Sequence, residues 1–148
     1  MIYRTATSSD KAAIENLFIE MLQSIYRTEK VEGYDSDYLC RFFADSEDSI
    51  IVAEQDNIVV GYISIEVKRE KLPYAYIDDF CVSMQYRNQG IGTRLLKCAE
   101  TYVKEKGISD ICLHVEMKNT SAQRLYEKNG YDILRADGSR RLMKKTIE

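Results

Sequence analysis

One segment of the sequence, residues 76–96, constrains the fold more than any other. Its first part, Tyr76 to Ser83, has the composition of a buried strand, and it leads through a turn that contains Gly90 and Gly92. That turn opens directly into a helical pattern with apolar residues at Leu95, Leu96, Ala99 and Val103. Backbone N–H groups of such a turn, added to the positive end of the helix dipole, form an anion site. The segment therefore predicts a strand–turn–helix unit that binds an anion.

Two common phosphate-binding loops do not fit this turn. A Walker loop requires the pattern G-x-x-x-x-G-K-[ST], which does not occur in the sequence. A dinucleotide fingerprint requires a third glycine three residues after Gly92, where Leu95 stands. The anion site therefore belongs to another class of loop.

The rest of the chain predicts one domain over residues 1–148 with the element order β-α-α-β-β-β-α-β-α-β-β. This order indicates an α/β fold with a mixed sheet and helices on both faces. Strands are expected at 2–7, 49–54, 58–67, 75–83, 108–115, 131–134 and 140–147. Helices are expected after the Ser8–Asp10 cap, at 36–44, from the glycine turn to Gly107, and at 120–129, with a turn at 136–139.

Composition argues against several classes of partner. The formal net charge of −3 gives no basic field for a nucleic acid, and no stretch approaches the ~20 apolar residues of a membrane span. The N-terminus lacks the apolar core of a signal peptide. Four cysteines, at 40, 81, 98 and 112, lie among apolar neighbours without metal-ligand spacing, so we expect reduced core residues, no metal and a cytoplasmic location.

Two motifs then resemble one family. Arg87-x-x-Gly90-x-Gly92 is similar to the [QR]-x-x-G-x-[GA] acetyl-CoA signature of GNAT N-acetyltransferases. Residues 119–131, Asn-Thr-Ser-Ala-Gln-Arg-Leu-Tyr-Glu-Lys-Asn-Gly-Tyr, resemble that family's later motif. The preceding strand is most similar to spermidine/spermine N-acetyltransferases. The resemblance implies a mostly antiparallel sheet of six or seven strands, with helices on both faces and a splayed parallel strand pair that binds acetyl-CoA.

The resemblance also implies which residues bind acetyl-CoA. The backbone from Asn88 to Thr93 would hold the pyrophosphate, and the main chain of Phe80, Cys81 and Val82 would pair with the pantetheine arm beside a β-bulge. Asn119 would hydrogen-bond the pantetheine, cap the following helix, or do both. The full expected set is Phe80, Cys81, Val82, Arg87, Asn88, Gln89, Gly90, Ile91, Gly92, Thr93, Asn119, Ala122 and Tyr126.

By the same resemblance, Tyr126 occupies the general-acid position, where a phenol could protonate the departing thiolate. Asp78 aligns with the acidic position of the polyamine enzymes and would take the amine's proton directly or through a water. Strand alternation places its neighbour Asp79 on the opposite face. The two carboxylates could instead be solvated or salt-bridged. The only histidine, His114, is expected to be structural.

The acceptor is less constrained by the sequence. Acidic residues between positions 29 and 48, interleaved with Tyr26, Tyr34 and Tyr38, would suit a cationic small-molecule amine, with Asp79 as a further contact. An acidic solvated loop is the alternative. A polyamine, amino acid, aminoglycoside or protein amine stays open as acceptor, and so does a homodimer. A silent acetyl-CoA-binding module and a structural interaction domain are the competing functions.

Overall fold

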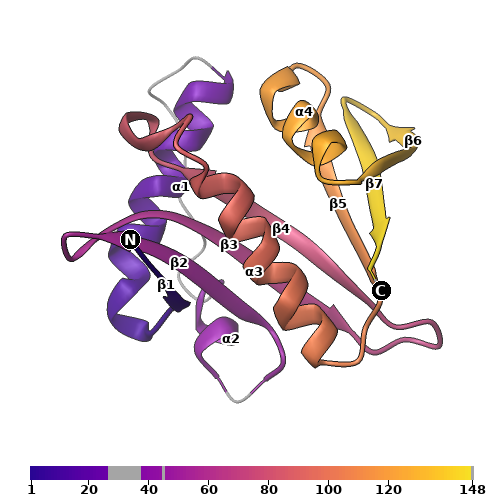
Figure 1. Ribbon diagram of the computed structural model, residues 1–148, viewed down its shortest axis with the longest axis horizontal. Helices are drawn as coiled ribbons and strands as arrows, with labels where there is room; N and C mark the ends of the chain where they lie inside the picture. The colour runs from indigo at the N-terminus through magenta and orange to yellow at the C-terminus, as the bar shows by residue number, and fades with distance from the viewer. Residues whose placement is uncertain (27–37, 45, 148) are drawn as a thin grey trace.

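The computed structural model describes residues 1–26, 38–44 and 46–147. Seven strands form one sheet in the order β1-β2-β3-β4-β5-β7-β6 (Figure 1). The strands are β1 (Ile2–Thr5), β2 (Ser49–Gln55), β3 (Ile58–Lys68), β4 (Tyr74–Val82), β5 (Asp110–Glu116), β6 (Asp132–Asp137) and β7 (Arg140–Thr146). The helices are α1 (Lys11–Tyr26), α2 (Cys40–Phe43), α3 (Ile91–Glu105) and α4 (Thr120–Lys128), with short 3-10 turns at Ser8–Asp10 and Met84–Tyr86.

Helices cover the two faces of the sheet and create two apolar cores. The apolar stripe predicted for α3 is fully buried at Leu95, Leu96, Ala99 and Val103, and it packs on the same side as Tyr126 of α4. The second core joins Ile14 and Leu17 of α1 to Phe42 of α2 and to the opposite face of the sheet. The predicted element order, mixed sheet and helices on both faces are confirmed.

The pairing of β4 with β5 is parallel, whereas every other neighbouring pair is antiparallel. The parallel register runs from Ala75 opposite Ile111 to Ile77 opposite Leu113. Beyond this three-pair seam the two strands continue without pairing to each other, so their facing edges open into a gap. The splayed parallel pair implied by the family resemblance is therefore present.

A β-bulge lies in β4 at the point where it leaves β5. Ile63 pairs with Phe80 but Ile65 pairs with Ile77, so β4 carries one extra residue opposite Ser64. The Asp79 N–H donates to the Ser64 hydroxyl oxygen at 2.9 Å. As a result, Phe80 packs against the same core as Ile77. The expected placement of Asp78 and Asp79 assumed a regular strand, whereas the bulge interrupts the two-residue period between Ile77 and Phe80.

Three local predictions also need correction. Helix α2 covers Cys40–Phe43 rather than 36–44, of which positions 36 and 37 lie outside the described residues. Strand β6 runs to Asp137 rather than ending at 134, because Asp137 pairs with Arg140 across a two-residue turn that starts at Gly138 with φ of 64°. Cys40, expected in the core, is exposed at the first position of α2, whereas Cys81 is buried.

Among the described residues, no helix is long and apolar enough to cross a membrane. The same residues contain no group of three or more His, Cys, Asp and Glu side chains placed to hold a metal ion.

Candidate active site

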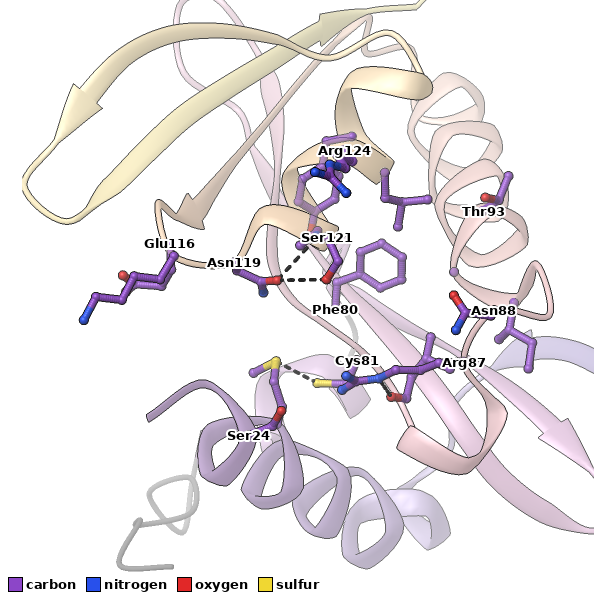
Figure 2. A pocket seen from close by; sticks show the side chains of 18 of the residues that line it. Ser24, Phe80, Cys81, Arg87, Asn88, Thr93, Glu116, Asn119, Ser121 and Arg124 are labelled. Carbon is purple, nitrogen blue, oxygen red and sulfur yellow. Dashed lines mark hydrogen bonds between the residues drawn. The ribbon is translucent and has the colours of Figure 1, made fainter. Parts of the chain in front are cut away.

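A groove of about 1500 Å³ lies beside the gap between β4 and β5. Figure 2 shows Phe80 in its middle, Asn88 and Thr93 at the start of α3, Ser121 and Arg124 on α4, and Ser24 on α1. Most of the residues predicted to bind acetyl-CoA or its acceptor line this groove: Tyr26, Phe80, Cys81, Val82, Arg87, Asn88, Gly90, Ile91, Gly92, Thr93, Asn119, Ala122 and Tyr126. Gln89, Asp78 and Asp79 are not in the lining, and Tyr34 lies outside the described residues.

The start of α3 forms one end of the groove. Gly90 is the N-cap with φ of 81°, and Asn88 also has a positive φ, of 63°. No side chain of the described residues caps this helix, so its first N–H groups keep their hydrogen-bonding capacity for an anion. A Cβ on Gly90 would meet nothing within 4 Å. Glycine is therefore needed there for its left-handed backbone conformation rather than for space.

Gly92 has a different reason to be glycine. A Cβ at this position would lie 3.3 Å from Leu125 Cδ2 and 3.5 Å from Phe80 Cζ. The sequence predicts that both glycines let the backbone approach an anion. At Gly92 the absent side chain also lets α3 pack closely against Phe80 of β4 and Leu125 of α4.

Asn119 begins α4 at the other side of the groove. Its Oδ1 accepts a hydrogen bond from the Ala122 N–H at 3.3 Å and one from the Ser121 hydroxyl at 3.4 Å (Figure 2). The predicted capping role of Asn119 is thus confirmed.

Tyr126 reaches the groove from α4. Its side chain is 6% exposed, and its ring centroid lies 6.0 Å from those of both Phe80 and Tyr131. Burial raises the pKa of the Tyr126 phenol well above its usual value, and nearby Cys81, Asp79 and Tyr76 raise it further. The phenol is therefore protonated over the whole neutral range. Its hydroxyl has no hydrogen-bond partner among the described residues, so the proton can be donated into the groove.

Carboxylates gather near the seam on the sheet face that carries α2. Buried Glu66 accepts from the guanidinium of Arg41, and its other oxygen lies 3.2 Å from Lys68 Nζ. Asp78 Oδ2 is 3.9 Å from Arg41 Nη2. Burial raises the pKa of Asp78, while the positive charge of Arg140 partly opposes that rise.

A hydrogen-bonded chain that the sequence analysis missed crosses the seam. The Tyr76 hydroxyl lies 2.6 Å from Nδ1 of His114, and Nε2 of His114 lies 2.9 Å from Asp137 Oδ2. Their neighbours Ile77 and Leu113 face the α3 core, so Tyr76 and His114 share the opposite face. This shared face was available from the strand period. The contact with Asp137 was not, because it depends on the longer β6.

The groove is also more basic than the chain as a whole. Its described lining contains the cations Arg87, Lys118, Arg124 and Lys128 but a single carboxylate, Glu116. Arg124 and Lys128 are four residues apart and so lie on one side of α4. With the apolar wall formed by Phe80 and Leu125, this lining fits a long ligand that has phosphate groups and a flexible, mostly apolar arm.

Comparisons with known proteins agree with this geometry. The sequence model of the Acetyltransferase (GNAT) family matches residues 13–131. An uncharacterized N-acetyltransferase, YhfO of Bacillus subtilis, is 30% identical over 139 residues, covering 89% of this chain and 90% of that protein. The spermidine N(1)-acetyltransferase of Thermoplasma acidophilum is 28% identical over 133 residues, covering 84% and 81% of the two chains. The crystal structure of PaiA N-acetyltransferase from Thermoplasma acidophilum in complex with coenzyme A superimposes with a TM-score of 0.81 at 21% identity, covering 98% of each chain.

Proposed function

This chain belongs to the acetyltransferase (GNAT) family and is an acetyl-CoA-dependent N-acetyltransferase, and from that premise we propose that it acetylates a primary amine of a small cationic molecule. The observation that carries the choice of acceptor is the pair of carboxylates at the β-bulge where β4 leaves β5, Asp78 and Asp79, since Glu66 on β3 is already paired with Arg41 and Lys68. Asp78 and Asp79 lie close to the point where the strands part, and a cationic amine would be attracted to them.

Acetyl-CoA supplies an activated acyl group, and the residues of the groove fit it. We infer that the free N–H groups at the start of α3 hold the pyrophosphate, with Arg87 and Arg124 adding positive charge. The unpaired edge of β4 at Phe80, Cys81 and Val82 offers backbone groups to the pantetheine amides. The first interaction uses N–H groups that no side chain of the described residues caps, and at the second the Val82 carbonyl also accepts a hydrogen bond from Arg87 Nε at 3.2 Å.

Acetyl transfer also requires two proton transfers, one to the departing thiolate and one from the amine. We propose Tyr126 as the donor to the thiolate, because its phenol is protonated, lines the groove and has a free hydroxyl among the described residues. For the amine's proton there are two candidate acceptors. Asp78 is held near Arg41, whereas the Tyr76–His114 pair lies directly across the seam. We favour the pair, because the Tyr76 hydroxyl and His114 Nδ1 lie 2.6 Å apart beside the point where the strands part, whereas Asp78 is 3.9 Å from the guanidinium of Arg41.

The proposal is tested by following CoA release with purified protein and a panel of amines at one concentration. The panel contains a polyamine, a basic and a neutral amino acid, an aminoglycoside, and a short peptide with a free N-terminus. A polyamine should give the highest kcat/KM, and its KM should rise with added salt because screening weakens the attraction. Faster turnover of the peptide, with a salt-independent KM, would instead identify a protein or peptide amine as the acceptor.

A further inference from the structure

We propose that Asp137, on the β6–β7 hairpin, is the positioning residue that prepares His114 to receive the amine's proton through the Tyr76 hydroxyl. This inference rests on the proposed acetylation of a primary amine. It adds a functional residue from a strand outside both sequence motifs, and it turns a histidine that the sequence analysis treats as structural into part of a proton relay.

The relay joins side chains from the adjacent strands β4 and β5 to one from β6, which lies beyond β7 in the sheet. Tyr76 on β4 and His114 on β5 flank the seam, one residue to either side of the last parallel pair, Ile77 with Leu113. Asp137 ends β6 and reaches the far nitrogen of the same ring at 2.9 Å. His114 is thus held at both ring nitrogens, with Tyr76 on the side toward β4 and Asp137 on the side toward the hairpin.

Asp137 decides which ring nitrogen carries the proton. Arg135 Nε donates to Asp137 Oδ1 at 2.9 Å, and hydrogen bonds from Arg135 and then His114 lower the pKa of the Asp137 carboxyl. An ionised carboxylate can only accept hydrogen bonds. Nε2 of neutral His114 must therefore carry the hydrogen and donate to Asp137. Nδ1 is then left with a lone pair, which accepts the Tyr76 O–H.

This orientation fixes the direction of proton transfer. The ammonium N–H bond breaks as its proton passes to the Tyr76 oxygen, and the Tyr76 O–H proton moves to Nδ1 of His114. The electron pair of the broken N–H bond stays on the amine nitrogen, which becomes neutral and nucleophilic. His114 becomes an imidazolium whose Nε2–H still faces the Asp137 carboxylate. One proton leaves the amine and one arrives on His114, and Asp137 stays ionised throughout.

The groups around the relay favour this sequence. Burial raises the pKa of Tyr76, so its phenol is protonated at rest and serves as a relay rather than as a stored phenolate. Arg140 lowers that pKa, whereas Glu66 and Asp79 raise it. The charged and titratable groups that act on the relay are therefore Glu66 on β3, Asp79 on β4, Arg135 on β6 and Arg140 on β7.

The direct test uses the fact that the chain contains one histidine. In protein labelled with ¹⁵N-histidine, the ring nitrogens give one pair of signals, whose coupling pattern identifies the protonated nitrogen. We expect the Nε2–H tautomer in the wild type and in the matched control Asp132→Asn, which removes a carboxylate from the same strand. Asp137→Asn, whose amide can donate to Nε2, should shift the population toward Nδ1–H, and Asp137→Glu should restore Nε2–H.

Kinetics then separate positioning from a structural role. For Asp137→Asn, kcat/KM for the amine should fall at neutral pH, on the order of 10- to 100-fold, within the range of acid–base contributions. The loss should shrink as pH approaches the amine's own pKa of ~10.4, where free amine no longer needs a base. Acetyl-CoA affinity should not change. Asp137→Glu should recover activity and Asp132→Asn should keep it.

Two results would overturn the inference: an unchanged tautomer in Asp137→Asn, or a changed tautomer with a wild-type acetylation rate at every pH. A failure of the proposed function looks different, because wild-type protein would then acetylate no amine in the panel. The tautomer measurement needs no acceptor, so it still reports whether Asp137 orients His114. Acetyl-CoA binding by each variant shows that the hairpin change leaves the fold intact.

Discussion

The ring of Tyr126 on α4 lies 6.0 Å from the ring of Phe80 on β4, centroid to centroid and tilted by 46°. Helix α4 and the bulged strand therefore meet through two aromatic side chains at the groove. The Tyr126 hydroxyl has no partner among the described residues, so its proton can go to a ligand while the ring stays held by packing. Packing and proton donation are thus separable at this one side chain.

Tyr126→Phe is expected to lower kcat by about 10²- to 10⁴-fold, because the substitution removes the proton donor and keeps the ring. Affinity for acetyl-CoA should change little, since one neutral hydrogen bond contributes only ~0.5–1.5 kcal/mol. The free energy of unfolding should also stay near the wild-type value. Pre-steady-state measurement of acetyl transfer checks this directly, and a chemical step at full speed would remove Tyr126 from the mechanism.

Gly90→Ala and Gly92→Ala should fail in different ways. At Gly90 the new methyl group meets no atom, but φ of 81° disfavours any L-residue by roughly 1–2 kcal/mol. The turn should therefore shift and acetyl-CoA affinity should fall, with the helices still packed. At Gly92 the methyl group presses on Leu125 at 3.3 Å, so stability should fall even without ligand. Thermal unfolding of each variant with and without acetyl-CoA distinguishes the two outcomes.

Arg124→Ala should raise the KM for acetyl-CoA, because Arg124 is one of four cations in a groove with a single carboxylate. A charge-assisted bond to phosphate lost from a partly exposed site should cost up to about tenfold, or ~1.4 kcal/mol. The remaining affinity should depend less on salt. Lys97→Ala on α3, outside the groove lining, is the control. Equal KM values for the two variants would contradict a phosphate contact at Arg124.

Asp10 should make stability depend on acid pH. Arg4 contacts its two oxygens at 2.8 and 3.0 Å, and the Thr7 N–H donates to it at 2.8 Å. These hydrogen bonds lower the pKa of Asp10 below its usual 3.8, and those from Arg4 have the larger effect. The stabilisation is therefore present above the unfolded-state pKa and lost as pH falls through the folded-state pKa. Asp10→Asn should cost about 1–3 kcal/mol at pH 7 and progressively less below pH ~4. Urea unfolding across that range measures the difference.

Local sequence patterns predicted most of the fold, because the apolar residues recur along the chain with the periods of the helices and strands that form. The α3 stripe, the glycine turn and the Asn119 cap each depend on residues within a few positions of one another, and the element order followed from them. The family resemblance predicted that the two parallel strands, β4 and β5, separate from each other. It also implied the bulge, although the expected alternation of Asp78 and Asp79 did not take that extra residue into account.

The features that were missed all depend on contacts between distant segments. His114 looked like an isolated strand histidine, because its partners Tyr76 and Asp137 are 38 and 23 residues away. The packing role of Gly92 was also missed, because nothing local reveals its contact with Leu125. The overall charge of −3 did not reveal the basic lining of the groove, because a net charge sums residues from the whole chain and does not describe a single binding site.

The short seam between β4 and β5 holds the groups of the proposed proton relay in register. In the part of the chain that the structure describes, three residue pairs join the strands β1–β4 to the strands β5, β7 and β6. Tyr76 belongs to the first group of strands, whereas His114 and Asp137 belong to the second. A molecule lying along the open edge of β4 supplies the stretch of sheet that the polypeptide leaves out. In the proposed binding mode, acetyl-CoA along the open edge of β4 would add contacts between these two parts of the sheet, and those contacts would be lost when CoA departs.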